Sequence, residues 1–149
     1  MIRPEFVVLQ SQASSAEEVI RELSELFLRH QIVKESYPEA VLNREREYPT
    51  ALPGKGFFVA IPHTDSSHVL ESGIAVATLQ TPVRFGLMSD PDKLVDVSLV
   101  FLLAVADPRE HLALLKRLME ILSDTKRLQK VLGASSADEV SDVMQTSIA

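Results

Sequence analysis

Residues 95–106, with the sequence VDVSLVFLLAVA, are the most apolar stretch of the chain and limit most strongly how it can fold. The stretch is too short to cross a membrane, which takes about 20 apolar residues. Because nearly every position is apolar, a strand formed here needs cover on both of its faces. Asp107-Pro108 follows directly and favours the start of a helix. The sequence therefore predicts a central strand that is buried on both sides.

The rest of the chain supplies strands and helices to surround this segment. Residues 6–9, 57–61 and 73–79 are short apolar runs typical of strands, and residues 81–83 either continue the last run or form a turn. We expect an α/β fold with a central mixed, largely parallel β-sheet sandwiched by helices on both faces. Without a repeat or a linker, residues 1–149 are predicted to be a single domain. Capping residues and helical spacing of apolar positions indicate helices after Ser14-Ser15, near Ser36-Tyr37-Pro38 (ending at Tyr48-Pro49), from Pro108, over residues 125–132 and after Ser136.

The composition excludes several classes of protein. With 46% apolar and 24% charged residues and a mean hydropathy of +0.10, the chain is neither disordered nor fibrous. Its net charge of −6 argues against a nucleic-acid partner. It has no cysteine, which excludes disulfides and thiolate metal sites, and its first residues lack the pattern of a signal peptide. We therefore expect a cytoplasmic protein.

Two of the four histidines follow strands and are candidates for chemistry. His63 comes directly after a predicted strand and Pro62, at the edge of the sheet where α/β proteins bind ligands. His111 lies in the first turn of the helix that follows the apolar segment, where free amides and the positive helix end suit an anion. Strand ends can lie side by side, so the two rings could meet. The alternatives are a His63 bonded to backbone and a His111 that caps a helix or lies on the surface, whereas His30 ends an amphipathic helix and is interpreted as structural.

The remaining motifs do not indicate a cofactor. A metal site would draw on His63, Asp65, His68, Asp107 and His111, but their spacing matches no established zinc pattern. No nucleophile elbow surrounds Ser66-Ser67, and no Walker loop is present. We expect neither a metal nor another cofactor. An exposed histidine without a nucleotide site could still carry a phosphoryl group on its imidazole.

A combination of motifs then points to a known family. Residues 44–50 read R-E-x-x-Y-P-T, residues 59–63 read V-A-I-P-H, and V-S-L-V-F and H-L-x-L-L follow at 97–101 and 111–115. Together they resemble the enzyme IIA component of the bacterial phosphoenolpyruvate-dependent sugar phosphotransferase system, fructose/mannitol type, over nearly the whole chain.

Finer details resemble the galactitol-specific members of this family. These are the 13-residue step from Thr50 to His63, the second histidine at His68, and Pro38-x-Ala40. Two features depart from the pattern: Thr64 stands where a smaller residue is usual, and galactitol-type members need not keep the histidine found here as His111.

The resemblance implies a phosphoryl relay. His63 would accept a phosphoryl group from the phosphohistidine of the carrier protein HPr and pass it to a cysteine of enzyme IIB, which serves the membrane transporter, enzyme IIC. His111 and Arg44 would stabilise the phosphoryl oxygens. Thr50 and His68 are further candidates for the site. Without the family, an ion pair with Glu47 is the simpler interpretation of Arg44, a loop-capping role fits Thr50 equally well, and His68 fits a surface loop.

Two other functions compete with transport. The first is a regulatory module of the same fold, as in nitrogen-type enzyme IIA proteins, whose phosphorylation alters binding to other proteins. The second is a small metal-dependent hydrolase, which requires bound metal. Neighbouring reading frames for IIB and IIC components would favour the transport function.

Overall fold

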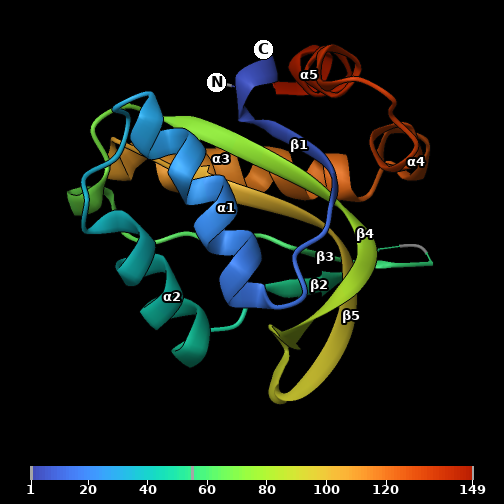
Figure 1. The fold of residues 1–149 in the computed structure, drawn as a ribbon, viewed down its shortest axis with the longest axis horizontal. Coiled ribbons are helices and arrows are strands. Elements are labelled where there is room, and N and C mark those ends of the chain that lie inside the picture. The colour runs from blue at the N-terminus through green and yellow to red at the C-terminus, as the bar shows by residue number, and fades with distance from the viewer. Residues whose placement is uncertain (1, 55, 149) are drawn as a thin grey trace.

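The predicted central strand forms the second half of β5 (Asp90–Ala104), where residues 99–104 are all buried. The computed structural model describes residues 2–54 and 56–148, so Met1, Lys55 and Ala149 of the predicted domain lie outside the described residues. The other elements, in chain order in Figure 1, are η1 (Pro4–Phe6), β1 (Val7–Ser11), α1 (Ala16–Arg29), α2 (Tyr37–Glu47), β2 (Ala51–Pro53), β3 (Phe58–Ala60), η2 (Ser66–His68), β4 (Gly73–Leu87), α3 (Pro108–Leu122), α4 (Thr125–Leu132) and α5 (Ala137–Ile148).

The five strands form one mixed sheet in the order β1-β4-β2-β3-β5, and β4 also pairs with β5. Three of the five pairings between these strands are parallel, namely β1–β4, β2–β4 and β3–β5. The longest pairing, β4–β5, is antiparallel because a short turn joins these two strands. The sheet is thus mixed as predicted, but its most extensive ladder is not parallel.

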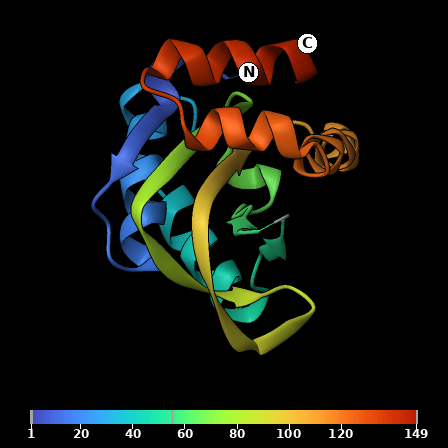
Figure 2. The same cartoon turned by 90° about the vertical axis from the view of Figure 1, so that its right-hand side faces the viewer.

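Helices cover both faces of the sheet, as predicted. Alternate residues of each central strand belong to different cores, as expected from the two-residue period of a strand. Ala75 and Leu102 pack with α1 and α2, whereas Ile74 and Phe101 pack with α3, α4 and α5. Figure 2 shows β4 and β5 curving between these two groups of helices.

Local sequence signals fix the helix starts. Ser15 caps α1 by accepting a hydrogen bond from the Glu18 amide at 3.1 Å, and the Glu18 carboxylate accepts one from the Ser14 amide at 2.7 Å. Asp107 caps α3, with Pro108 in its first turn. The Ser15–Glu18 pair and the Asp107-Pro108 start are those that the sequence predicts, whereas Ser14 contacts Glu18 rather than Glu17.

The strands follow one of the two predicted alternatives at residues 81–83 and depart from the prediction at β5 and β2. β4 continues through residues 81–83, with a register shift between Thr78 and Val83 that accommodates Pro82 where the ladder is interrupted. β5 accordingly begins at Asp90, and its first five residues are exposed. The short strand β2 was not predicted, because Pro53 and Gly54 are typical of a loop.

Tyr37 ties α2 to the central strand, and its removal should weaken the fold. Its fully buried hydroxyl donates a hydrogen bond to the Leu103 carbonyl at 2.6 Å, and burial raises the Tyr37 pKa well above its ordinary value. We expect Tyr37→Phe to lower the free energy of unfolding by about 1–3 kcal/mol, because a buried acceptor loses its partner. Urea denaturation measures this loss. Tyr48→Phe, at a side chain that is 62% exposed, is the control and should leave stability unchanged; equal stability of both variants would contradict the prediction.

Candidate functional site

His63 lies just beyond the carboxyl end of β3, behind Pro62. Its residue is only 8% exposed, and its Nδ1 lies 2.7 Å from the Ile61 carbonyl oxygen. A carbonyl oxygen only accepts hydrogen bonds, so Nδ1 carries the proton. In the neutral ring Nε2 therefore keeps its lone pair and is the free, nucleophilic nitrogen.

His111 meets His63 from the other side of the pocket. β3 and β5 are parallel neighbours, so their carboxyl ends lie at the same edge of the sheet. The turn after β5 leads into α3, whose fourth residue is His111. The two imidazole centroids are 5.0 Å apart, with the ring planes at 60°. The structure thus brings together the two histidines that the sequence placed after strands.

Arg44 supplies a positive charge from α2. Its guanidinium carbon lies 5.5 Å from the centre of the Tyr48 ring. The pair with Glu47 is not formed: among the residues that the structure describes, no carboxylate lies at salt-bridge distance from Arg44. The charge is therefore available to an anion beside His63.

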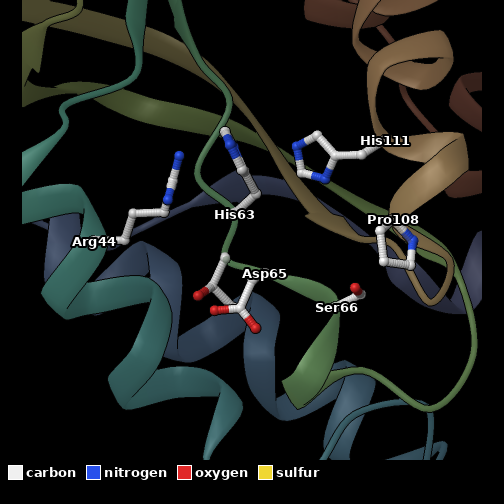
Figure 3. A pocket seen from close by; sticks show the side chains of 7 residues that line it. Arg44, His63, Asp65, Ser66, Pro108 and His111 are labelled. Atoms are coloured by element: carbon white, nitrogen blue, oxygen red, sulfur yellow. The ribbon is translucent and has the colours of Figure 1, made fainter.

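These side chains surround one open pocket of about 230 Å³. In Figure 3 the His63 ring stands between Arg44 and His111. Ser66 and Pro108 were not predicted to belong to this site, although each lies within three residues of a candidate histidine. The pocket is lined by Arg44, His63, Thr64, Asp65, Ser66, Pro108 and His111.

The environment favours the neutral form of both rings. Burial lowers the pKa of His63, with smaller contributions from His111 and Arg44 in the same direction, while the hydrogen bond to Ile61 opposes them. Burial and the charge of Arg44 likewise lower the pKa of His111. The site therefore combines a neutral nucleophilic imidazole, a second imidazole and a fixed cation, which suits transfer of a phosphoryl group.

The expectation of free amides at the start of α3 is wrong. Pro108 has no N–H, and the Arg109 amide donates to the Asp107 carboxylate at 2.9 Å. The Glu110 amide donates to the Asp107 carbonyl at 3.0 Å. Because the capping residue occupies these donors, α3 contributes the His111 side chain and its dipole rather than backbone hydrogen bonds.

Thr50 and His68 do not line the pocket. Thr50 is 3% exposed, and its hydroxyl is bonded to Glu45 and to the Ile61 amide. His68 lies on η2, where its Nδ1 is 2.7 Å from the Ser36 hydroxyl.

Glu45 is a buried acid next to the site that the sequence analysis missed. Burial raises the pKa of Glu45 to about 7, although the hydrogen bonds from Thr50 act to lower it. The signal for it is helical spacing, since Glu45 falls on the buried face of α2 with Val41 and Leu42.

Residues 2–54 and 56–148 contain neither a candidate metal site nor a candidate membrane span. No group of three or more His, Asp or Glu side chains in this part of the chain could hold a metal ion. No helix of these segments is long and apolar enough to span a membrane.

Comparison with known proteins assigns the chain to a family. Residues 1–147 match the family model described as "Phosphoenolpyruvate-dependent sugar phosphotransferase system, EIIA 2". The chain belongs to this EIIA family. Residues 44–50 and 59–63, which carry the sequence resemblance, supply Arg44 and His63 of this EIIA pocket.

Individual EIIA relatives are similar to the chain in sequence and in fold. The galactitol-specific EIIA component of Escherichia coli K12 is 34% identical over 99 residues, 66% of this chain and 65% of that protein. The match therefore spans somewhat less than two thirds of that relative. The enzyme IIA mannitol structure from E. coli, in complex with phosphorylated enzyme IIB mannitol, gives a TM-score of 0.81 at 26% identity, covering 98% of this chain and 99% of that one. The nitrogen regulatory protein IIA-Ntr of Neisseria meningitidis gives 0.75 at 26%, covering 96% and 95%.

The protonation of His63 leads to a prediction on pH. We expect the folded protein to titrate at His63 with a midpoint below the ordinary value of 6.5, because burial lowers this pKa. Nε2 then keeps its lone pair as the pH falls through 6.5. The unfolded chain takes up the proton at about 6.5, so the contribution of His63 to stability decreases as the pH falls below that value. A ¹⁵N NMR titration, with urea-unfolded protein as the reference, measures the midpoint; a value at or above the reference would contradict the prediction.

Proposed function

We propose that the chain is a phosphoryl-carrier EIIA component of a sugar phosphotransferase system. His63 accepts the phosphoryl group from the phosphohistidine of HPr and passes it to a cysteine of enzyme IIB, which serves a membrane enzyme IIC. The observation that carries the proposal is the hydrogen bond from His63 Nδ1 to Ile61. It leaves Nε2 free in a pocket that also holds His111 and Arg44.

The transfer step follows from this geometry. The Nε2 lone pair attacks phosphorus in line with the donor imidazole, and the donor P–N bond breaks with its electron pair returning to that imidazole. The proton stays on Nδ1, which keeps donating a hydrogen bond to the Ile61 carbonyl. This hydrogen bond stabilises the positive charge that the ring gains while the new bond forms. Arg44 and His111 stabilise the phosphoryl oxygens. In the second step the thiolate of IIB attacks phosphorus, and His63 is released as the leaving group.

The comparisons favour a polyol or sugar transport system over the regulatory alternative. The relative at 34% identity is a galactitol-specific component, and the structure with a TM-score of 0.81 is a mannitol enzyme IIA bound to its IIB partner. We propose galactitol or a related polyol as the transported substrate. Residues 1–149 would act as one EIIA domain in the cytoplasm, where HPr donates the phosphoryl group.

Reconstitution of the relay tests the proposal. The chain is incubated with enzyme I, HPr and phosphoenolpyruvate, and its intact mass is measured. We expect the mass of one added phosphoryl group, no addition when HPr is left out, and transfer to a galactitol-type IIB component. Absence of labelling in the complete mixture would overturn the proposal.

A chelation arm of the same experiment tests the chemistry of transfer from phosphorylated HPr. We expect purified phospho-HPr to label the chain fully in the presence of EDTA and without ATP, because the side chains of the pocket supply the nucleophile and the cation. Loss of this single step in EDTA, restored by zinc, would favour the hydrolase-type site.

A further inference from the structure

The chain just beyond the end of β3, which leads to His63, is held in place by the Thr50 side chain. Backbone pairing between β2 and β3 ends at Ala51 and Ala60. One residue further, the Ile61 amide donates to Thr50 Oγ1 at 3.2 Å, so a hydroxyl extends the ladder by one step. The carbonyl of the same Ile61 accepts the hydrogen bond from His63 Nδ1. The position of Ile61 therefore determines how the His63 ring is oriented.

Glu45 fixes Thr50 in turn. Its two carboxylate oxygens accept the Thr50 hydroxyl at 2.8 Å and the Thr50 amide at 2.9 Å. Because the only hydroxyl proton is given to Glu45, a lone pair of Thr50 Oγ1 remains for the Ile61 amide. Both side chains are buried, where hydrogen bonds are stronger than in water and costly to leave unmade.

The next residue is held from the opposite side. The Pro62 carbonyl accepts a hydrogen bond from the Leu103 amide of β5 at 3.1 Å, and the Leu103 carbonyl accepts the one from Tyr37. Tyr37 and Glu45 both lie on α2, the helix that also carries Arg44. One helix thus anchors the backbone before His63 and supplies the cation beside it.

Resting on the proposed function, we propose that Glu45 and Thr50 are positioning residues for phosphoryl transfer. They hold the Ile61 backbone so that its carbonyl keeps His63 in the tautomer with a free Nε2. Neither side chain lines the pocket, so both act through Ile61 rather than on the reacting atoms.

Thr50→Val tests this proposal, because valine keeps the shape of threonine and removes its hydroxyl. In the unphosphorylated protein, ¹⁵N shifts of the His63 ring should show a larger share of the Nε2–H tautomer than in wild type. Single-turnover acceptance from phosphorylated HPr should fall on the order of tenfold, because misplacement of the nucleophile slows transfer steeply. Thr50→Ser keeps the hydroxyl and should return both the tautomer and the rate to near wild type.

Thr78→Val is the matched control. Thr78 is also a buried threonine whose hydroxyl accepts a backbone hydrogen bond, from Gln10 at 2.8 Å, but it joins β4 to β1. We expect Thr78→Val to lower the stability of the protein without changing the His63 tautomer. Equal tautomer changes in both valine variants, or none in Thr50→Val, would overturn the proposal.

Glu45→Gln provides a second test of the proposal, which remains available if Thr50→Val does not fold. It replaces one of the two acceptor oxygens by a donor, so we expect the same changes in a smaller amount, and unchanged readouts would remove Glu45 from the proposal. The tautomer measurement needs no phosphoryl donor. Failure of wild type to accept a phosphoryl group would therefore overturn the proposed function and leave the positioning test standing.

Discussion

Labelling by the reconstituted relay is expected to disappear when His63 is replaced by alanine. In the structure His63 combines a nearly complete enclosure, 8% exposed, with a tautomer that leaves Nε2 free. Within residues 2–54 and 56–148, no hydrogen bond fixes the tautomer of His111, the other ring in the pocket, and this ring is more open to water than His63. We therefore expect all of the phosphoryl group on His63. Intact mass after incubation with enzyme I, HPr and phosphoenolpyruvate measures the effect.

His30→Ala is the matched control for this experiment. Its ring packs on Phe6 with a centroid distance of 5.1 Å, and its Nδ1 lies 2.9 Å from the Leu26 carbonyl oxygen at the end of α1. This variant should be labelled as fully as wild type. A labelled His63→Ala protein would place the phosphoryl group on another residue and end the assignment of His63.

The second large effect is expected from His111→Ala. The His111 ring is close enough to His63 to donate a hydrogen bond to a phosphoryl group on Nε2, and the negative phosphoryl oxygens favour its protonated form. Loss of one such donor typically costs about 3–4 kcal/mol in the transition state. Arg44 remains in the variant, so we expect a smaller loss, on the order of tenfold to a hundredfold in rate.

Single-turnover transfer from phosphorylated HPr, with thermal melting alongside, measures this effect. The melting temperature should change little, because His111 is only partly buried. Glu120→Ala, an exposed change near the other end of α3, should leave both the rate and the melting temperature unchanged. An unchanged transfer rate in His111→Ala would show that the ring takes no part in transfer. A large drop in melting temperature would show that the role of the ring is structural.

The parts of the molecule that could be predicted are those determined by residues close together in the sequence. The apolar segment gave a buried strand because neither face of it could meet water, and Ser15 and Asp107 mark helix starts because their side chains accept the first free amides. His63 and His111 could be placed at one sheet edge since each follows a strand. The role proposed for Arg44 came from the family resemblance, because local patterns alone would have paired this residue with Glu47.

The parts that could not be predicted depend on contacts between distant segments. Pro82 is a turn signal in isolation, and only the interrupted register of β4 against β5 shows how a strand accommodates it. Helical spacing places Glu45 on the buried face of α2, but nothing in its run of charged neighbours indicates that its partner is Thr50, which is itself bonded to the Ile61 amide beyond β3. Thr50 itself became a support of the backbone because the chain returns through β3 beside it.

The long β4–β5 hairpin has a consequence for how the chain acquires its final structure. Its two strands are neighbours in sequence, so their pairing closes only a small loop and can form early. In contrast, the hydrogen bond from the Gln10 amide to Thr78 joins residues that are 68 positions apart in sequence. The parallel pairing of β3 with β5 likewise joins segments that are far apart in sequence. Pairings of this kind are slow to form. Since Pro62 is anchored on Leu103 of β5, we expect the residues around His63 to reach their final positions only when β3 docks, so that competence for chemistry appears late in folding.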